Sequence, residues 1–213
     1  MSLRVNRVLA AKDDAFAALI AAVGPCTALR ASTRSKTLRE VTPFQALAES
    51  IAYQQLNGKA AQTIWGRVLK LSNGRPPSPA SIIKTPSEAL RAAGLSRAKV
   101  LAIQDLAAKT IEGVVPTRRQ ALGMSDAELI ELITQVRGIG PWTVQMFLIF
   151  TLQRPDVMPE TDYGVRNGFS ILYRKRRLPT PGELLQFSER WKPYRSYAAW
   201  YLWQAVNISN AKR

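Results

Sequence analysis

Residues 135–144 read QVRGIGPWTV, with two glycines around one isoleucine and a proline and a tryptophan directly after them. Glycine accepts a positive φ and lets another backbone come close, so Gly138 and Gly140 can turn the chain between two helices. Pro141 suits the first turn of the following helix, where its missing N–H group costs nothing. The stretch therefore predicts a hairpin between two helices, with the side chain of Ile139 tucked inside the turn.

The hairpin also has the form of an anion site. Unpaired backbone N–H groups at the N-terminus of a helix attract anions, and a nucleic-acid phosphate is a natural ligand for a basic protein. A glycine at the end of a helix is nevertheless common in ordinary turns. The Gly-Ile-Gly tripeptide on its own therefore favours a plain turn between two core helices.

Nearly every other segment has helical periodicity. Ser125 and Glu128 are spaced as a capping box, and an apolar stripe follows them. No alternating run is long enough to indicate a strand. We therefore predict an all-α fold, with further helices near residues 13–23, 43–56, 60–71, 87–93 and 97–112, a surface loop at 72–79 and a break at 153–161.

The charge balance points to a polyanionic partner. The 213 residues include 30 Lys and Arg against 15 Asp and Glu, a net charge of +15. From Asp162 onward, the sequence contains ten basic residues and only three acidic ones. A basic amphipathic helix or a lipid anchor would indicate a membrane surface, and the sequence contains neither. We therefore expect nucleic acid, and no membrane, as the partner.

The rarity of metal-binding side chains excludes several classes of site. The chain has no histidine and one cysteine, Cys26, so a disulfide within the chain, a zinc site of the usual Cys/His kind and a four-cysteine iron–sulfur cluster are excluded. We expect no metal site. The N-terminus does not resemble a signal peptide. We expect a reducing compartment: the cytoplasm, near the nucleoid, of a bacterium, or the nucleus of a eukaryote.

Four segments together resemble one known family. The hairpin and the apolar stretch after it resemble the helix-hairpin-helix of the DNA glycosylase superfamily, in which an aspartate follows about twenty residues later. Here that residue is Asp162, since 162 − 142 = 20. The resemblance runs from about residue 43 to 203 and is to the 3-methyladenine DNA glycosylase II family, in its segments SIAYQQLNGKAA (50–61), MPETDYGVRNG (158–168) and WKPYRSYA (191–198).

The resemblance implies an organisation as well as a fold. It implies one glycosylase domain over residues 1–213, made of two packed helical subdomains with the active-site cleft between them. The first subdomain would comprise about 1–40 and 155–213, and the second about 41–154 with the helix-hairpin-helix at 129–150. We expect the short form of the family, without the N-terminal β-rich domain of its longer members.

The resemblance makes Asp162 the catalytic residue. Cleavage of an N-glycosidic bond builds positive charge on the deoxyribose ring, and a nearby carboxylate stabilises that charge and can orient the attacking water. The residues alone favour another interpretation, because Asp162 precedes a helical stretch and suits an N-cap. Both roles are compatible, since capping would hold the carboxylate in place.

Trp142 occupies the position where bifunctional relatives carry a lysine that attacks the sugar. An indole cannot form a Schiff base, and no lysine occurs between residues 136 and 162, so the resemblance implies a monofunctional enzyme without lyase activity. An aromatic face also suits a cationic alkylated base. The resemblance assigns Met146 and Trp203 to the same base pocket. A tryptophan on an apolar helix is otherwise more often part of the core.

The resemblance also assigns the residues that would contact DNA. Flipping a base leaves a gap that inserted side chains must fill. The implied plug or wedge residues are Gln55, Asn57, Leu95 and Ser96, which the residues alone would place at helix ends. The implied contacts to the DNA backbone are Arg137, Gly138, Ile139, Gly140 and Thr143.

The sequence thus predicts a DNA glycosylase that flips alkylated purines, of the 3-methyladenine and 7-methylguanine type, and hydrolyses the glycosidic bond to leave an abasic site for base excision repair. Two alternatives remain open: a non-catalytic helix-hairpin-helix DNA-binding module, and a glycosylase for another base lesion. We expect a monomer acting on double-stranded DNA with alkylated bases. We expect no cofactor, although the family admits a monovalent cation held by hairpin carbonyls.

Overall fold

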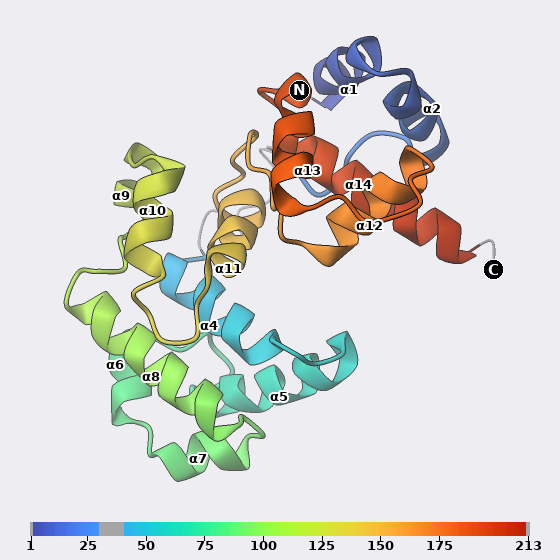
Figure 1. Cartoon of the computed structure of the whole chain (residues 1–213). Helices are drawn as coiled ribbons and strands as arrows, with labels where there is room; N and C mark the ends of the chain where they lie inside the picture. The colour runs from blue at the N-terminus through green and yellow to red at the C-terminus, as the bar shows by residue number, and fades with distance from the viewer. Residues whose placement is uncertain (1, 30–40, 212–213) are drawn as a thin grey trace. The chain divides into compact units, whose positions relative to one another are not determined.

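The computed structural model describes residues 2–29 and 41–211, and no strand occurs within them, which confirms the all-α prediction (Figure 1). The helices are α1 (Ser2–Lys12), α2 (Asp14–Val23), α4 (Pro43–Tyr53), α5 (Gly58–Leu71), α6 (Pro79–Lys84), α7 (Ser87–Ala92), α8 (Arg97–Ile111), α9 (Arg118–Gly123), α10 (Asp126–Ile133), α11 (Pro141–Met146), α12 (Tyr163–Leu172), α13 (Pro181–Ser188) and α14 (Arg195–Ala211). A π-helical turn, η1 (Phe147–Thr151), and a 3₁₀ turn, η2 (Glu189–Trp191), complete the series.

The helix ends follow local capping signals. Ser125 and Glu128 form the predicted capping box at the start of α10, with the Glu128 N–H donating to Ser125 Oγ at 3.2 Å. The helix at 43–56 ends earlier than predicted, at Tyr53, because Gln55 adopts a left-handed φ of 55°. Helix α6 was not predicted, and it begins at Pro79, where the loop was expected to end.

The chain divides into two compact units. Unit 1 consists of residues 1–34 and 148–213, and unit 2 of residues 35–147. The chain therefore passes from unit 2 to unit 1 within the π-helical turn η1, seven residues before the break expected at 154/155.

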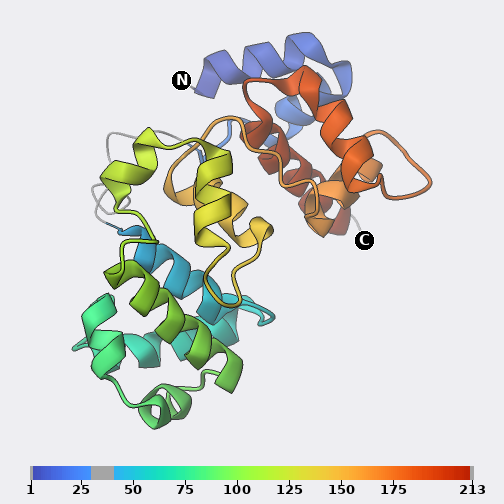
Figure 2. The same cartoon turned by 60° about the vertical axis from the view of Figure 1, so that its left-hand side comes forward.

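Unit 2 is built around α8, which packs against α4, α6 and α7, while α4 also packs against α5 and α10 against α11 (Figure 2). Each of these helices turns an apolar face inward, and the side chains on these faces pack together as the core of unit 2. The fully buried side chains include Leu47, Ile51, Ile103, Leu106, Leu129 and Ile133.

Unit 1 joins the two ends of the chain. Helix α14 packs along α12 and also contacts α2, so segments far apart in the sequence lie side by side (Figure 1). The approach of α12 to α14 requires a glycine, because a Cβ on Gly168 would lie 2.0 Å from the carbonyl oxygen of Leu202. Beside this pair, Phe16 and Trp191 pack in an aromatic cluster with ring centroids 5.0 Å apart.

Two other features bear on function. Among the residues that the structure describes, no helix combines the length and the apolar character that a membrane crossing needs. Over the same residues, no three cysteine or carboxylate side chains gather into a group that could hold a metal ion.

Candidate active site and nucleic-acid interface

Asp162 lies at the start of α12 and caps it. Its Oδ1 atom accepts the backbone N–H of Val165 at 2.7 Å, which satisfies one of the unpaired donors of the first helical turn. The capping interpretation of Asp162 is therefore correct. Because the cap fixes the carboxylate at a defined place, it is compatible with a catalytic role for the same group.

Trp203 holds the same carboxylate from α14. Its indole Nε1–H donates to Asp162 Oδ1 at 2.9 Å. Gly164 makes this contact possible, because a Cβ at that position would lie 2.9 Å from the indole Cδ1 and 3.1 Å from Asp162 Oδ1. A tryptophan, an aspartate and a glycine thus form one compact arrangement in unit 1.

Two further aromatic residues extend this arrangement. The ring of Phe150 stacks on that of Trp203, with centroids 5.8 Å apart and planes 27° from parallel. Tyr163, directly after Asp162, is 67% exposed. An exposed aromatic surface beside a fixed carboxylate suits a planar ligand attached to a sugar. The sequence did not identify Phe150, whose contact with Trp203 joins residues 53 positions apart.

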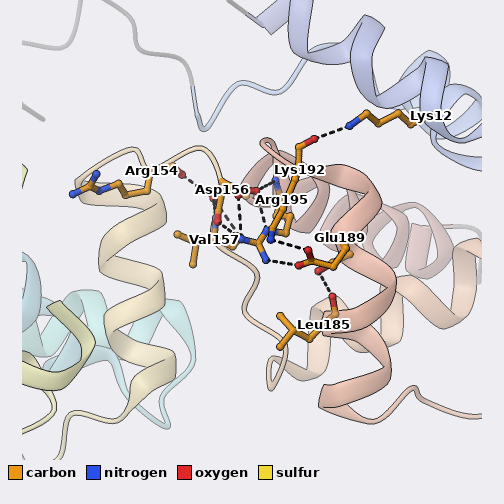
Figure 3. A network of polar contacts seen from close by, with 10 residues as sticks. Lys12, Arg154, Asp156, Val157, Leu185, Glu189, Lys192 and Arg195 are labelled. Carbon is orange, nitrogen blue, oxygen red and sulfur yellow. Dashed lines mark hydrogen bonds and ion pairs between the residues drawn. The ribbon is translucent and has the colours of Figure 1, made fainter. Parts of the chain in front are cut away.

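An ion-pair network anchors the segment that leads to Asp162 (Figure 3). Arg195, at the start of α14, donates from Nε to Asp156 Oδ1 at 2.8 Å and from Nη2 to Oδ2 at 3.0 Å. Its Nη1 also reaches Glu189 at 3.3 Å. Ser196 Oγ, in turn, accepts the backbone N–H of Val157 at 2.9 Å. The Arg-Ser pair of the WKPYRSYA segment therefore ties the chain just before Asp162 to the helix that carries Trp203.

In unit 2, the predicted hairpin connects α10 and α11. Gly138 has a φ of 76°, and Ile139 is buried, as predicted. The turn is anchored by Asp105 of α8, whose Oδ2 accepts the backbone N–H of Arg137 at 2.7 Å. Burial raises the pKa of Asp105, but the hydrogen bonds from Arg137 and Lys109 outweigh it and leave the pKa below its ordinary value.

The hairpin residues differ in what they can offer a phosphate. The N–H of Ile139 donates to Val136 O at 3.1 Å and that of Thr143 to Gly140 O at 3.0 Å, so these two amides are already paired. Within the described part of the chain, the amides of Gly138 and Gly140 donate to no acceptor. The side chain of Arg137 is exposed. Three of the five predicted backbone-contact residues therefore present a donor that a phosphate could use.

The turn after α4 is tied to the hairpin and to α8. Gln54 Nε2 donates to the carbonyl of Gly138 at 3.0 Å. Lys99 Nζ donates to the carbonyls of Ala52 and Gln54 at 2.8 and 2.7 Å, and burial lowers its pKa. Gln55 is left exposed in a left-handed conformation, which is strained for a residue other than glycine. Neither Gln54 nor Lys99 was predicted as a site residue.

The remaining plug candidates occupy different surroundings. Asn57 and Ser96 are exposed and act as N-caps, accepting the N–H of Ala60 at 2.9 Å and of Lys99 at 3.3 Å. Leu95 is only 2% exposed, so its side chain belongs to the core of unit 2 and not to the surface. Of the two wedge candidates in this loop, Ser96 is therefore the one whose side chain is exposed.

The base-pocket candidates of unit 2 lie on α11. Trp142 is 42% exposed, so it is not the buried core residue that a tryptophan on an apolar helix usually is. Met146 lies one turn further along the helix and is half-buried. Trp142 therefore presents an aromatic surface to the outside of unit 2.

Comparisons with known proteins agree with this geometry. A Schizosaccharomyces pombe protein named DNA-3-methyladenine glycosylase 1 is 41% identical over 177 residues, which cover 83% of this chain and 78% of the relative. The solved structure of the 3-methyladenine DNA glycosylase of that yeast, in complex with abasic DNA, matches with a TM-score of 0.82 at 39% identity, covering 94% of this chain and 95% of the other.

A solved bacterial structure extends the likeness. The DNA-3-methyladenine glycosidase from Bacillus halodurans matches with a TM-score of 0.83 at 31% identity, covering 96% of this chain and 90% of that one. The family described as HhH-GPD superfamily base excision DNA repair protein matches residues 48–193. This range contains both the hairpin and Asp162. The chain therefore belongs to the HhH-GPD superfamily of base excision DNA repair proteins.

Proposed function

We propose that the protein is a monofunctional DNA glycosylase that excises alkylated purines and leaves an abasic site. One observation carries the proposal: Asp162 is held at the start of α12 by the N–H of Val165 and by the indole of Trp203. The proposal is further supported by relatives named as 3-methyladenine glycosylases.

The carboxylate of Asp162 stabilises the positive charge that develops on the deoxyribose as the glycosidic bond breaks. The base leaves with the bonding electron pair, water adds to the anomeric carbon, and the proton of that water passes to the carboxylate or to solvent. An alkylated purine such as 7-methylguanine already carries a positive charge, so it leaves as a neutral molecule. One carboxylate is therefore enough, and no general acid is needed.

Trp142 is the reason for expecting hydrolysis without strand cleavage. An indole nitrogen does not attack the sugar, so water is the nucleophile and no covalent intermediate forms. We propose that the exposed face of Trp142, with Met146 beside it, binds the alkylated base. The π cloud attracts the positive charge of that base. Trp203 and the stacked Phe150 supply a second aromatic surface.

Unit 2 provides the proposed DNA contacts. The amides of Ile139 and Thr143 already donate to backbone carbonyls, so the amides of Gly138 and Gly140 and the side chain of Arg137 are the proposed phosphate donors. Gln55 is the proposed plug, because it is exposed and its strained turn is held from two sides by Gln54 and Lys99. Asn57 and Ser96 would contribute through their exposed positions at helix starts.

No step of this reaction is assigned to a cation. The hairpin carbonyls of Val136 and Gly138 accept N–H groups from Ile139 and Gln54, and each carbonyl oxygen keeps a second lone pair. Hairpin carbonyls could therefore hold a monovalent cation, which would add positive charge beside a bound phosphate. The proposed mechanism uses the protein's own groups alone.

The proposal is tested by incubating the purified protein with duplexes that each carry one modified purine and measuring base release and abasic sites. Wild-type protein should release alkylated purines and give no covalent adduct with borohydride. Asp162→Asn should lower the excision rate by roughly 10²–10³. Asparagine caps a helix about as well as aspartate, so the fold should be unchanged. A wild-type protein that binds these duplexes but releases no base would be a non-catalytic module.

A further inference from the structure

The loop after α12 carries the longest run of basic residues in the chain, Arg-Lys-Arg-Arg at 174–177. All four residues are exposed. Arg177 is paired with Glu183 at 2.6 Å. Within the described residues, Arg174, Lys175 and Arg176 form no ion pair. The loop therefore holds three positive charges that no carboxylate among the described residues neutralises.

Hydrogen bonds hold this loop in a defined conformation. The N–H of Lys175 donates to Ser170 O at 2.9 Å, and Ser170 Oγ donates to the carbonyl of Arg177 at 3.0 Å. Arg166 Nε donates to the carbonyl of Pro179 at 2.8 Å. The loop is thus folded back onto the end of α12, and its charges are kept close together at one place.

A hollow of about 340 Å³ runs along α12 to this loop. Its lining is chiefly polar and includes Tyr163, Asn167, Ser170, Lys175 and Arg176. The first three lie four and then three residues apart, so they share one face of the helix. Tyr163 directly follows Asp162. The hollow therefore extends from the catalytic end of α12 to the basic loop at its other end.

We propose that this hollow binds the phosphodiester backbone of the substrate DNA, as a contact separate from the hairpin. The identity of the ligand as duplex DNA rests on the proposed function. Lys175 and Arg176, which form no ion pair among the described residues, and the amide of Asn167 together match the charge and the acceptor oxygens of phosphates. The ten residues of α12 span about 15 Å, a length over which one strand of duplex DNA carries roughly four phosphates.

The test compares two variants that remove the same charge. Lys175→Gln/Arg176→Gln neutralises two cations of the hollow. Arg4→Gln/Arg7→Gln neutralises two exposed cations of α1, which form no ion pair within the described residues and do not line the hollow. Affinity for an undamaged duplex is measured by fluorescence anisotropy over a range of salt concentrations. Both variants carry the same net charge, so a difference in their affinity for DNA must come from where the two charges lie on the protein.

The first variant should reduce the slope of log affinity against log salt by about two, because each phosphate contact contributes about 0.9. Near 0.1 M salt its affinity should be tens-fold lower, and the difference should shrink as salt rises. The α1 variant should keep the wild-type slope. Excision of a bound lesion at saturating protein should be unchanged in the α1 variant. Equal slopes for the two variants would overturn the proposal.

A second measurement identifies the contacted phosphates. Single phosphates of the duplex are replaced in turn by neutral methylphosphonates. At least one replacement should weaken binding by the wild type but not by Lys175→Gln/Arg176→Gln, and identical sensitivity of the two proteins at every phosphate would also overturn the proposal. If the wild type released no base, the proposed glycosylase function would be refuted, but a measured contact between the hollow and DNA would still stand. If excision were normal and the two variants had equal salt slopes, the proposed contact would be refuted and the glycosylase function would stand.

Discussion

The indole N–H of Trp203 and the carboxylate of Asp162 are joined by a hydrogen bond of 2.9 Å, across 41 positions of sequence. The same carboxylate oxygen accepts the N–H of Val165 at 2.7 Å. Two donors on one oxygen restrict rotation of the carboxyl group, and such preorganisation is what electrostatic catalysis needs. The bond also links the start of α12 to the middle of α14, so the packing of unit 1 decides where the carboxylate lies.

Gly164→Ala should impair excision through this hydrogen bond. The added methyl group would lie 2.9 Å from Cδ1 and 3.0 Å from Nε1 of Trp203, so the indole must shift away from Asp162. A hydrogen bond to a charged group contributes about 1.5–3 kcal/mol. The single-turnover excision rate should therefore fall roughly ten- to hundred-fold, measured on a duplex with one alkylated purine, while affinity for undamaged DNA remains unchanged.

Gly182→Ala is the matched control. A Cβ at this position of α13 would meet nothing within 4 Å, so the variant should excise bases at the wild-type rate. The free energy of unfolding of both variants should be measured alongside the rate. If Gly164→Ala excised bases as fast as Gly182→Ala, the bond between Trp203 and Asp162 would have no role in catalysis.

What the sequence could predict depended on how local each feature was. The capping box at Ser125, the turn at Gly138 and the cap at Asp162 each depend on residues within four positions, and all three are present. The contact between Phe150 and Trp203 depends on how distant helices pack, and no local pattern indicates it.

At Leu95, a local sequence pattern did not predict whether the side chain is buried. The segment's resemblance to known glycosylases suggested a wedge, but Gly94, with a φ of 107°, turns the chain so that Leu95 enters the core. The hydrogen bond from Arg137 to Asp105 joins residues 32 positions apart, and no local sequence pattern predicts it either. Sequence patterns therefore predicted local turns and caps better than the surroundings of individual side chains.

Asp105→Asn should destabilise the protein in a pH-dependent way. The pKa of Asp105 is below its ordinary value in the folded protein, so its contribution to stability is fully present above about pH 4 and is lost as the pH falls through the folded value. The difference in unfolding free energy between wild type and variant should be constant from pH 6 to 8 and should shrink towards pH 3, as measured by urea unfolding. An equal difference at pH 3 and pH 7 would show that the charge of Asp105 does not stabilise the hairpin.

Gly140→Val should weaken DNA binding without unfolding the hairpin. Gly140 is exposed, has an ordinary φ of −99°, and would give a Cβ no neighbour within 4 Å, so valine adds its bulk at the surface, where a phosphate would approach. Affinity should fall alike for damaged and undamaged duplexes, because phosphate contacts carry no base information. Normal affinity of the folded variant would make the hairpin a structural turn only.

Gly138→Ala should behave differently from Gly140→Val. Gly138 has a φ of 76°, and its Cβ would lie 3.3 Å from that of Ala102, so alanine is strained by conformation and by contact. Its unfolding free energy should fall by about 1–3 kcal/mol. Thermal or urea unfolding of the two variants separates this loss of stability from the loss of a phosphate contact.

Trp142→Ala should lose excision in a way that depends on the charge of the lesion. The indole is 42% exposed on α11, and stacking of a base on an aromatic side chain contributes about 1–3 kcal/mol. A positively charged base adds attraction to the π cloud, so the loss should be tens-fold or more for 7-methylguanine and smaller for the neutral base hypoxanthine. Trp142→Phe should retain part of the activity on both, because it keeps a smaller aromatic face. Single-turnover rates on matched duplexes give the comparison, with affinity for undamaged DNA as the control for folding and backbone contact. Equal losses on cationic and neutral lesions would mean that Trp142 contributes shape alone, and the preference for alkylated purines would then have to come from the leaving group and not from the pocket.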